Sequence, residues 1–366
     1  MMKSKNKEEL SYIKNFPVFI GDTSQKKELD IFEDLIFDIC KNTGMIQLRK
    51  NVDPKLVYSH FHSENIGEVW NQHHALLSEI IKKYSKNKKI LEIGGSDSRL
   101  ALMTLNEDIK KWTIVDPIPK AKIINEKLEY IEAFFSEDIL HNYEYDTIIH
   151  SHLIEHIIDP SIFLESISNS LKDGNYHIFS IPNLYKWLKN KAVNTLTFEH
   201  ILFLTEEFVD YMLSCHNFSI VEKIYYNEHS IFYVTKKEKT VPLKSPNKYT
   251  EYKKLYLSCF NYYKEYVNNL NEFIEKTDKD VYLFGGAFTS QYLISIGLNT
   301  SKIKCILDNS KMKNGKRLYG TDLIIKSPTT VNLNENSLII LKIYSDEIKK
   351  QFFKINPNIQ FYEEEF

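Results

Sequence analysis

A buried strand that runs into a pair of glycines and then into a helix limits the possible folds of this chain more than any other feature. The segment ILEIGGSDSRL places Gly94 and Gly95 at that turn. Glycine can adopt positive φ and lets a ligand approach the backbone closely, and the following helix start offers unpaired N–H groups. The segment predicts a strand–turn–helix unit that binds a nucleotide, although a tight turn without a ligand would use the same glycines.

Strand and helix patterns alternate around this turn. Runs rich in β-branched and aromatic residues, each bounded by turn formers, are typical of buried strands: KKILEIG, KWTIVDP, LEYIEAFF, YDTIIHSHL and YHIFSIP. A helix is expected over PSIFLESISNSLKDG, and two further strands near residues 218–237 predict a hairpin. We therefore expect an α/β fold with a doubly wound, mostly parallel sheet and an antiparallel edge hairpin.

The length of 366 residues suits two or three domains. Before the predicted sheet, residues 1–65 alternate short apolar pieces with turn formers and form a small module. Residues 66–237 hold the sheet. Residues 238–366 begin with a proline-containing linker and a long amphipathic helix, and continue as a second α/β unit. That unit has its own glycine turn, Gly285-Gly286, with Asp308 at the next strand end, but lacks a third spaced glycine. We expect a scaffold that closes over the substrate.

The charge and cysteine patterns exclude several classes of protein. A net charge of −2, without a basic block, predicts binding to neither nucleic acid nor membrane. The four cysteines lie far apart, which indicates a reducing compartment and no disulfide framework. The N-terminus has no signal-peptide pattern, and no apolar run approaches the ~18 residues of a membrane helix. We expect a cytoplasmic protein, as a monomer or a homodimer.

Acidic residues around the first glycine turn narrow the choice of ligand. Asp116 ends the next predicted strand, where a carboxylate accepts hydrogen bonds from ribose hydroxyls. Glu92 precedes the turn and Asp97 follows it. Negative charge here disfavours a pyrophosphate and suits a ligand that carries a sulfonium and an amine. S-adenosylmethionine therefore fits this turn better than NAD.

The same segments resemble successive motifs of the class I S-adenosylmethionine-dependent methyltransferases, whose core is a Rossmann-like sheet. They are LEIGGSDSRL, IVDP, EAFFSED and YDTIIHSHLIEHIIDP. LTFEHILFLTEEF and YLFGGAFTSQYL, with CILDNSKMKNGKRLYGT, extend the resemblance over nearly the whole chain to sugar C-methyltransferases of deoxysugar pathways. The resemblance implies a small N-terminal zinc module, a methyltransferase core and a C-terminal α/β domain.

The Glu199-His200 pair is the candidate for catalysis. The resemblance places this histidine where the sugar binds, and histidine suits general-base work near neutral pH. We assign His200 as the base and Glu199 as its orienter or a substrate contact. The alternative is a polar step into a helix. For the similar pair Glu155-His156, we favour a structural role for His156.

Further residues are candidates for lining the two ligands. Phe134 follows the third predicted strand and would stack on adenine, or belong to the core. His150 or Ser151, near the end of the next strand, would line the methionine portion. The sugar or its nucleotide base would contact Phe61, His62 and Asn183.

Three departures from the family pattern stand out. The zinc module needs four cysteines, but Cys40 stands alone, with Thr43 in the place of its partner. One thiolate cannot hold a tetrahedral structural zinc ion, so we expect a degenerate remnant without zinc and assign no residue to a metal. The family tyrosine two residues before the glutamate is Thr197 here, and a second active-site tyrosine aligns with Phe61.

These observations together predict an S-adenosylmethionine-dependent methyltransferase that methylates a nucleotide-linked keto-deoxy sugar at a carbon beside the ketone, in the assembly of a bacterial polysaccharide. The missing tyrosines favour a close alternative, O-methylation of a sugar hydroxyl. An NAD-dependent oxidoreductase and a non-catalytic scaffold that binds S-adenosylmethionine are more remote alternatives.

Overall fold

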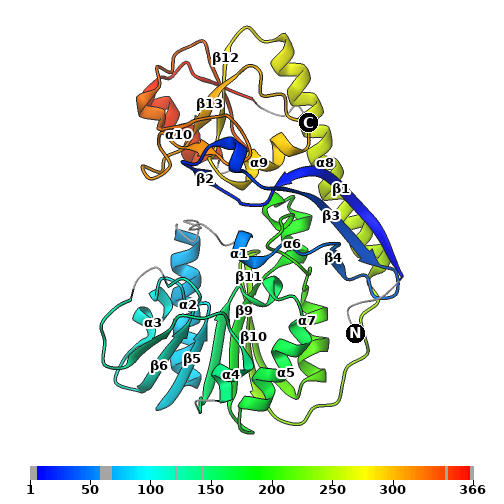
Figure 1. The fold of residues 1–366 in the computed structure, drawn as a ribbon, viewed down its shortest axis with the longest axis vertical. Coiled ribbons are helices and arrows are strands. Elements are labelled where there is room, and N and C mark those ends of the chain that lie inside the picture. The colour runs from blue at the N-terminus through cyan, green and yellow to red at the C-terminus, as the bar shows by residue number, and fades with distance from the viewer. Residues whose placement is uncertain (1–5, 58–67, 120–121, 142–143, 343–344, 363–366) are drawn as a thin grey trace.

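The computed structural model describes residues 6–57, 68–119, 122–141, 144–342 and 345–362. A body built on a seven-stranded sheet and a second body built on a five-stranded sheet lie at the two ends of the molecule, joined by the long helix α8 (Tyr249–Lys276) (Figure 1). Among the described residues, no helix combines the length and the apolar content that a membrane crossing requires.

The seven-stranded sheet confirms the predicted doubly wound fold. Its strands follow the order β10-β11-β9-β8-β5-β6-β7, with β5 to β9 parallel and β11 and β10 added antiparallel at one edge. Ile148 and Ile149 of the central strand β8 are both fully buried, as expected for a strand covered on both faces. The strands are β5 (Lys88–Ile93), β6 (Ile109–Val115), β7 (Leu128–Ile131), β8 (Thr147–Ser151), β9 (Tyr176–Pro182), β10 (Phe218–Tyr226) and β11 (Ser230–Lys237).

Helices cover the two faces of this sheet. Helices α2 (Glu68–Tyr84) and α3 (Arg99–Thr104) share one apolar cluster with Ile90 and Trp112. Helices α4 (Glu137–His141), α5 (Pro160–Ser170) and α7 (Glu206–Cys215) lie on the other face, where Phe163 of α5 shares a second cluster with Leu91. Neighbouring residues of β5 therefore serve opposite faces, which fixes the register of the strand.

Two predicted elements differ in length from the observed ones. The strand expected over LEYIEAFF ends at Ile131, and all four residues of β7 are only half-buried. Because β7 is an edge strand, it has one neighbour and little cover, so its aromatic continuation leaves the sheet. The helix expected to stop at Asp173-Gly174 ends at Ser170, and Asp159 caps its start by accepting from the backbone N–H groups of Ser161 and Ile162.

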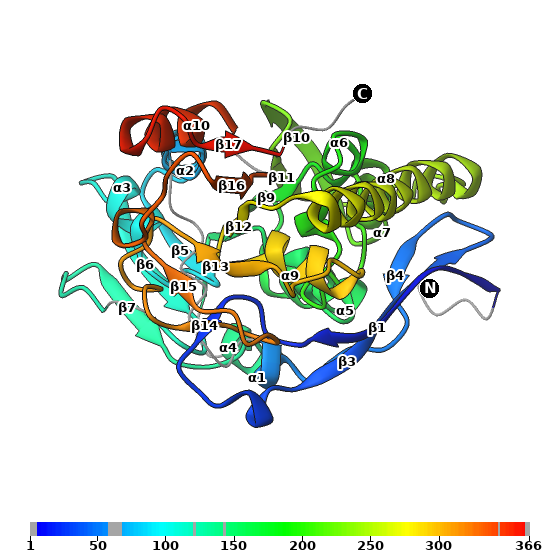
Figure 2. The same cartoon turned by 90° about the horizontal axis from the view of Figure 1, so that it is seen from above.

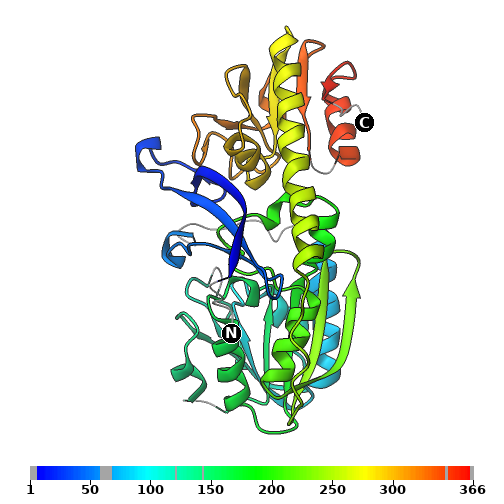
Figure 3. The ribbon, with the colours of Figure 1, turned by 90° about the vertical axis from the view of Figure 1, so that its right-hand side faces the viewer.

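The N-terminal module is an antiparallel ribbon of β1 (Lys7–Pro17), β3 (Phe32–Cys40) and β4 (Ile46–Leu48). Between β1 and β3, β2 (Asp22–Thr23) pairs with β14 (Arg317–Leu318) of the C-terminal body, and Arg317 binds Asp30 through two bonds of 2.6 and 2.8 Å. The ribbon therefore joins the C-terminal body by backbone and ionic contacts (Figure 3).

Backbone hydrogen bonds close the turn that follows Cys40. Cys40 is buried at the end of β3, where its N–H donates to Met45 and its carbonyl accepts from Gly44. Thr43 accepts from the backbone of Met45 through its hydroxyl and from the N–H of Lys248 through its carbonyl. Hydrogen bonds within this turn and to the residue before α8 hold the segment.

The C-terminal body is a parallel sheet in the order β15-β13-β12-β16-β17, seen from above in Figure 2. A buried stripe of tyrosines and aliphatic residues along α8, from Tyr252 to Ile274, belongs to the main apolar cluster. The elements of this body are β12 (Asp280–Phe284), α9 (Phe288–Ser295), β13 (Ile303–Leu307), β15 (Ile325–Lys326), β16 (Ser337–Ile340), α10 (Ser345–Ile355) and β17 (Gln360–Phe361). Two short helices come earlier in the chain, α1 (Pro54–Val57) before the seven-stranded sheet and α6 (Leu184–Lys189) after β9.

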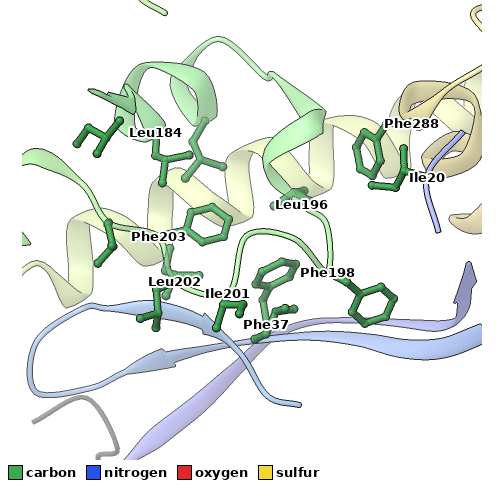
Figure 4. Close-up of a cluster of buried hydrophobic side chains, with 14 of the residues drawn as sticks. Ile20, Phe37, Leu184, Leu196, Phe198, Ile201, Leu202, Phe203 and Phe288 are labelled. Carbon is green, nitrogen blue, oxygen red and sulfur yellow. The ribbon is translucent and has the colours of Figure 1, made fainter. Parts of the chain in front are cut away.

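The three parts meet in one apolar core. Leu196, Phe198, Ile201 and Phe203 lie together with Phe37 of β3, Leu184 of α6 and Phe288 of α9 (Figure 4). The first four come from residues 196–204, an extended segment whose apolar side chains are almost fully buried. This segment contains Glu199 and His200, so the shared core determines where that pair lies.

Candidate active site

The first glycine turn has the shape that its sequence predicts. Gly94 has a φ of +81°, and its N–H donates to the carbonyl of Val115 at 2.8 Å. A Cβ on Gly95 would lie 2.5 Å from Cδ of Glu92, so no side chain fits there. The turn therefore needs glycine at both positions, one for its backbone conformation and one for the close approach of a buried carboxyl.

Asp116 stands at the carboxyl end of β6, beside this turn. Its carboxylate accepts the backbone N–H of Ser96 at 3.1 Å and that of Ile118 at 2.8 Å. A carboxylate can accept several hydrogen bonds at once, and at the end of this strand ribose hydroxyls are among the donors that it would accept. Asp97 lies at the start of α3 and pairs with Arg99 at 3.0 Å. The structure therefore brings Gly94, Gly95, Asp97 and Asp116 to one edge of the sheet.

Glu92 lies beneath the turn rather than at its rim. It is 5% exposed and accepts the indole N–H of Trp112 at 2.8 Å. Burial raises the pKa of Glu92 to about 8, against the lowering effect of the Trp112 bond, and the charges of Asp97 and Asp116 add to the rise. Glu92 thus supports the turn from within.

The two candidates at the end of β8 point to different places. Ser151 is half-buried, and its hydroxyl bonds to Nε2 of His73 and to the hydroxyl of Ser180, both at 3.0 Å. His150 is fully buried: its ring stacks on Phe179 at 4.8 Å, and its Nε2 lies 3.0 Å from that of His177. Because strand side chains point to the faces of a sheet, His150 lies in the core and is not brought to the ligand edge.

The remaining ligand candidates are dispersed. Phe134 is 50% exposed in the loop after β7, on the side of Asp116. Asn183 caps α6 by accepting the N–H of Lys186 and lines a cavity of about 400 Å³ with Tyr185, Lys186, Glu206, Glu207, Tyr225, Asn227, Glu228 and Glu251. Phe61 and His62 lie outside the described residues.

The Glu199-His200 pair does not lie at a helix entry, because α7 begins only at Glu206. Its segment lies between two other elements. Ile201 accepts the N–H of Leu48, and Phe203 donates to Ile46, so the segment pairs with β4. On the other side Ile201 donates to the carbonyl of Glu155 at 3.1 Å. Backbone contacts to both neighbours therefore determine the position of His200.

The tautomer of His200 follows from its contacts. Nδ1 lies 3.1 Å from the carbonyl oxygen of Thr195, which can only accept, so Nδ1 carries the proton and Nε2 the lone pair. The side chain is buried, and burial lowers the pKa of His200 to about 4, although the Thr195 carbonyl opposes the change. His200 is therefore a neutral imidazole at neutral pH with a lone pair on Nε2, and its burial makes it a weaker base than the near-neutral histidine that the sequence suggested.

The Glu155-His156 pair joins this site. His156 donates from Nδ1 to the carbonyl of Glu199 at 2.8 Å, and its ring lies 5.2 Å from that of His200. Glu155 is 1% exposed, and neither of its carboxyl oxygens has a hydrogen bond within the described part of the chain. Burial raises the pKa of Glu155 to about 8. His156 bridges the end of β8 to the Glu199-His200 segment, and Glu155 is a buried acid that sequence reasoning did not select.

Sequence reasoning also missed a cluster of histidines beside Ser151. His73 from α2, His152 after β8 and His229 from the turn between β10 and β11 bring their ring nitrogens within 4.8 Å of one another. Their separation along the chain gave no spacing signal. His73 stands beside His74 in the sequence, but nothing there indicates that His152 and His229 lie nearby.

Comparisons with known proteins agree with this architecture. Residues 67–223 match the family model of a methyltransferase domain, and residues 220–357 match that of a C-methyltransferase C-terminal domain. The chain belongs to the S-adenosylmethionine-dependent C-methyltransferase family, and it is an S-adenosylmethionine-dependent methyltransferase. No curated protein matches the chain.

Several solved structures are similar to about half of the chain. The N-methyltransferase NodS from Bradyrhizobium japonicum is 12% identical over 48% of this chain and 99% of its own, with a TM-score of 0.36. The carbon methyltransferase CurJ is 13% identical over 47% of this chain and 56% of its own, with a TM-score of 0.37. The 1,6-didemethyltoxoflavin-N1-methyltransferase from Burkholderia thailandensis is 14% identical over 47% of this chain and 81% of its own, with a TM-score of 0.36.

Proposed function

We propose that this enzyme methylates a carbon next to the ketone of a nucleotide-linked keto-deoxy sugar, with His200 as the general base. The observation that carries the proposal is the state of His200: a buried, neutral imidazole with its proton fixed on Nδ1 and its lone pair on Nε2. The match of residues 220–357 to a C-methyltransferase C-terminal domain supports a carbon acceptor.

The ligand edge of the sheet suits S-adenosylmethionine. The strictly glycine turn lets the ligand approach the backbone, Asp116 stands at the strand end where a carboxylate accepts ribose hydroxyls, and the acids around the turn favour a cation. Phe134 would cover the adenine, and Ser151 would lie near the methionine portion. When bound, S-adenosylmethionine supplies an electrophilic methyl group on sulfur.

The chemistry assigned to the chain's own residues is a proton transfer followed by positioning. Nε2 of His200 removes the proton from the carbon beside the ketone, and the resulting enolate carbon takes the methyl group while the sulfonium becomes a thioether. A positioned base contributes about 10²–10⁴-fold in rate. Holding the two reactants in line contributes up to about 7–11 kcal/mol. Glu199, whose carbonyl accepts from His156, helps to hold the segment.

O-methylation of a sugar hydroxyl is the second candidate, and one observation favours it. Thr197 replaces the family tyrosine, is 4% exposed, and uses its hydroxyl to accept the N–H of Glu199 at 3.0 Å. It therefore offers no phenol to stabilise an enolate oxygen, whereas an alkoxide needs none.

Transfer of a deuterated methyl group distinguishes the candidates. The enzyme would be given S-adenosylmethionine labelled on the methyl group, with nucleotide-linked 4-keto-6-deoxy sugars and their reduced counterparts. Mass spectrometry and carbon NMR would locate the label. We expect it on the carbon beside the ketone, with kcat lowered about 10²–10⁴-fold in His200→Gln. His216→Gln is the matched control, because His216 is a half-buried histidine at the end of α7 whose Nε2 lies 2.8 Å from the hydroxyl of Ser161 in α5. A label on oxygen, or an unchanged rate in His200→Gln, would refute the proposal.

A further inference from the structure

Three histidines from separate elements surround one buried hydroxyl next to the proposed site. The oxygen of Ser230 lies 3.2 Å from Nδ1 of His73, 2.8 Å from Nε2 of His152 and 2.7 Å from Nδ1 of His229. Ser230 itself is fully buried. Three imidazole nitrogens thus face a common centre, which the Ser230 hydroxyl occupies. An ion would take the place of that hydroxyl, which would turn aside, and the nitrogens would close in to about 2.0–2.1 Å, the length of zinc–nitrogen bonds.

Outer contacts orient the first two histidines toward this centre. Nε2 of His73 bonds to the hydroxyls of Ser151 and Ser180 at 3.0 and 3.2 Å, which leaves Nδ1 facing inward. His152 has a φ of +47°, in the left-handed region that histidine adopts at a cost. Nδ1 of His152 lies 3.9 Å from the carboxyl of Glu155. Histidine ligands of metals commonly pair their second nitrogen with such a carboxylate.

Glu155 provides an independent observation that points to a cation. Its two carboxyl oxygens have no hydrogen bond within the described residues, although the side chain is 1% exposed. A buried carboxyl without a hydrogen bond is costly, and the two histidine nitrogens near it, Nδ1 of His152 and Nε2 of His156, lie 3.9 and 3.8 Å away. A cation bound by His152 would strengthen the attraction between the Nδ1–H of His152 and Glu155, and would give this acid a partner.

The third histidine is anchored through its backbone. The carbonyl of His229 accepts the N–H of Asn183 at 2.9 Å and the indole N–H of Trp187 at 3.0 Å. The ring of Trp70 covers the cluster, with its centroid 5.1 Å from His73, 4.9 Å from His152 and 4.8 Å from His229. The cluster is therefore held from outside and shielded on one side.

We propose that His73, His152 and His229 bind one divalent metal ion of the zinc class, with a fourth position open to an oxygen ligand. Neutral imidazoles favour zinc and its transition-metal neighbours over magnesium or calcium. Three histidines with an open position are the ligand set of catalytic rather than structural zinc sites. The sequence analysis expected no metal, but it considered only a cysteine site in the N-terminal module. The proposed site uses histidines of the methyltransferase core instead.

The open position gives the ion a use in methyl transfer, and this part of the inference rests on the proposed function. A ketone oxygen of the acceptor bound there would be polarised as His200 removes the neighbouring proton. The charge of the enolate oxygen would then be stabilised by the ion, in the place of the phenols that are absent at Thr197 and Phe61.

Metal binding can be measured without S-adenosylmethionine or sugar, so its failure is distinct from failure of the proposed function. The full chain would be stripped with a chelator and titrated with Co²⁺, followed by its visible absorption, and then with Zn²⁺ in a calorimeter. We expect one ion per chain and displacement of Co²⁺ by Zn²⁺. We expect affinity lowered at least about 100-fold in His229→Gln and about 10–100-fold in Glu155→Gln, which lies behind a ligand.

Two matched controls define the site. His216→Gln removes a half-buried histidine outside the cluster, and His156→Gln removes one from the neighbouring group of Glu155, His156 and His200. Both should keep the affinity of the unaltered chain, and metal-free melting curves would show that all variants fold. Absence of stoichiometric binding, or equal affinity in His229→Gln, would overturn the proposal. Loss in His156→Gln with none in His229→Gln would also overturn it.

Discussion

The molecule contains the same backbone turn twice, and we propose that only the first copy binds S-adenosylmethionine. Gly94 and Gly285 have φ values of +81° and +105°, and each donates its N–H at 2.8 Å to the end of the next strand. Asp116 and Asp308 follow those strands and accept backbone N–H groups with both carboxyl oxygens. Backbone geometry therefore does not distinguish the two turns.

The side chains around the two turns differ. Leu283 stands two residues before its glycine pair, where the first turn has Glu92, and Phe288 stands where the first has Asp97. Phe288 is 5% exposed, and its ring lies 6.1 Å from that of Phe16 in the N-terminal ribbon. Lys313 lies 3.5 Å from Asp308. The second turn thus holds the ribbon, while the first keeps an acidic edge.

The largest difference between the turns should concern the affinity for S-adenosylmethionine. Asp116→Asn removes the charge from an acceptor of ribose hydroxyls, and hydrogen bonds to charged groups contribute about 1.5–3 kcal/mol. We expect the Kd for S-adenosylmethionine to rise about 10–150-fold by calorimetry. The matched variant Asp308→Asn should leave the Kd unchanged. Equal losses in both variants would mean that the aspartates act through folding.

A smaller difference is expected for stability when each second glycine gains a methyl group. In Gly95→Ala the Cβ would meet the buried Glu92 carboxyl at 2.5 Å, which cannot move without breaking the Trp112 bond. We expect a loss of about 1–3 kcal/mol in the free energy of unfolding.

In Gly286→Ala the nearest atom is the terminal methyl of Ile325, at 2.9 Å, which can rotate. The loss should therefore be less than in Gly95→Ala, and S-adenosylmethionine binding should persist. Urea unfolding would measure both variants. A greater loss in Gly286→Ala would contradict the assignment of Glu92 as a rigid support.

The smallest expected effect is a dependence of the free energy of unfolding on pH, which only the first turn should show. The folded pKa of Glu92 is about 8, above its ordinary value of 4.5, so the folded chain binds this proton more tightly than the unfolded chain. Stability should therefore fall as pH rises from about 4.5 toward 8.

Glu92→Gln removes this titration and keeps an acceptor for Trp112. Relative to the unaltered ligand-free chain, the variant should gain about 1 kcal/mol between about pH 5 and about pH 6. Leu283→Met, at the matching position of the second turn, should show no pH-dependent difference. Parallel stability curves for Glu92→Gln and the unaltered chain would show that Glu92 ionises normally.

The parts that the sequence predicted are those set by local patterns. The buried strands β5, β6, β8 and β9 carry β-branched runs between turn formers, and the edge hairpin carries the same signal. The glycine turn together with the acids Glu92, Asp97 and Asp116 predicted the cofactor. The length of β7 was not predictable, because its cover depends on its place at the sheet edge.

The features that could not be predicted depend on distant contacts. Pairing of β2 with β14 joins opposite ends of the chain, so the ribbon of residues 7–48 gave no fold signal. His150 looked like a ligand contact because it ends a strand, but its direction depends on which face the residue serves. The cluster of His73, His152 and His229 needs three elements to assemble.

The role of His200 can be tested before any methyl group moves. The enzyme and the keto sugar would be incubated in D₂O without S-adenosylmethionine, and proton NMR would follow loss of the signal on the carbon beside the ketone. The account predicts exchange catalysed by the unaltered chain and slowed about 10²–10⁴-fold in His200→Gln. Equal exchange in the variant and in the unaltered chain would contradict His200 as the base.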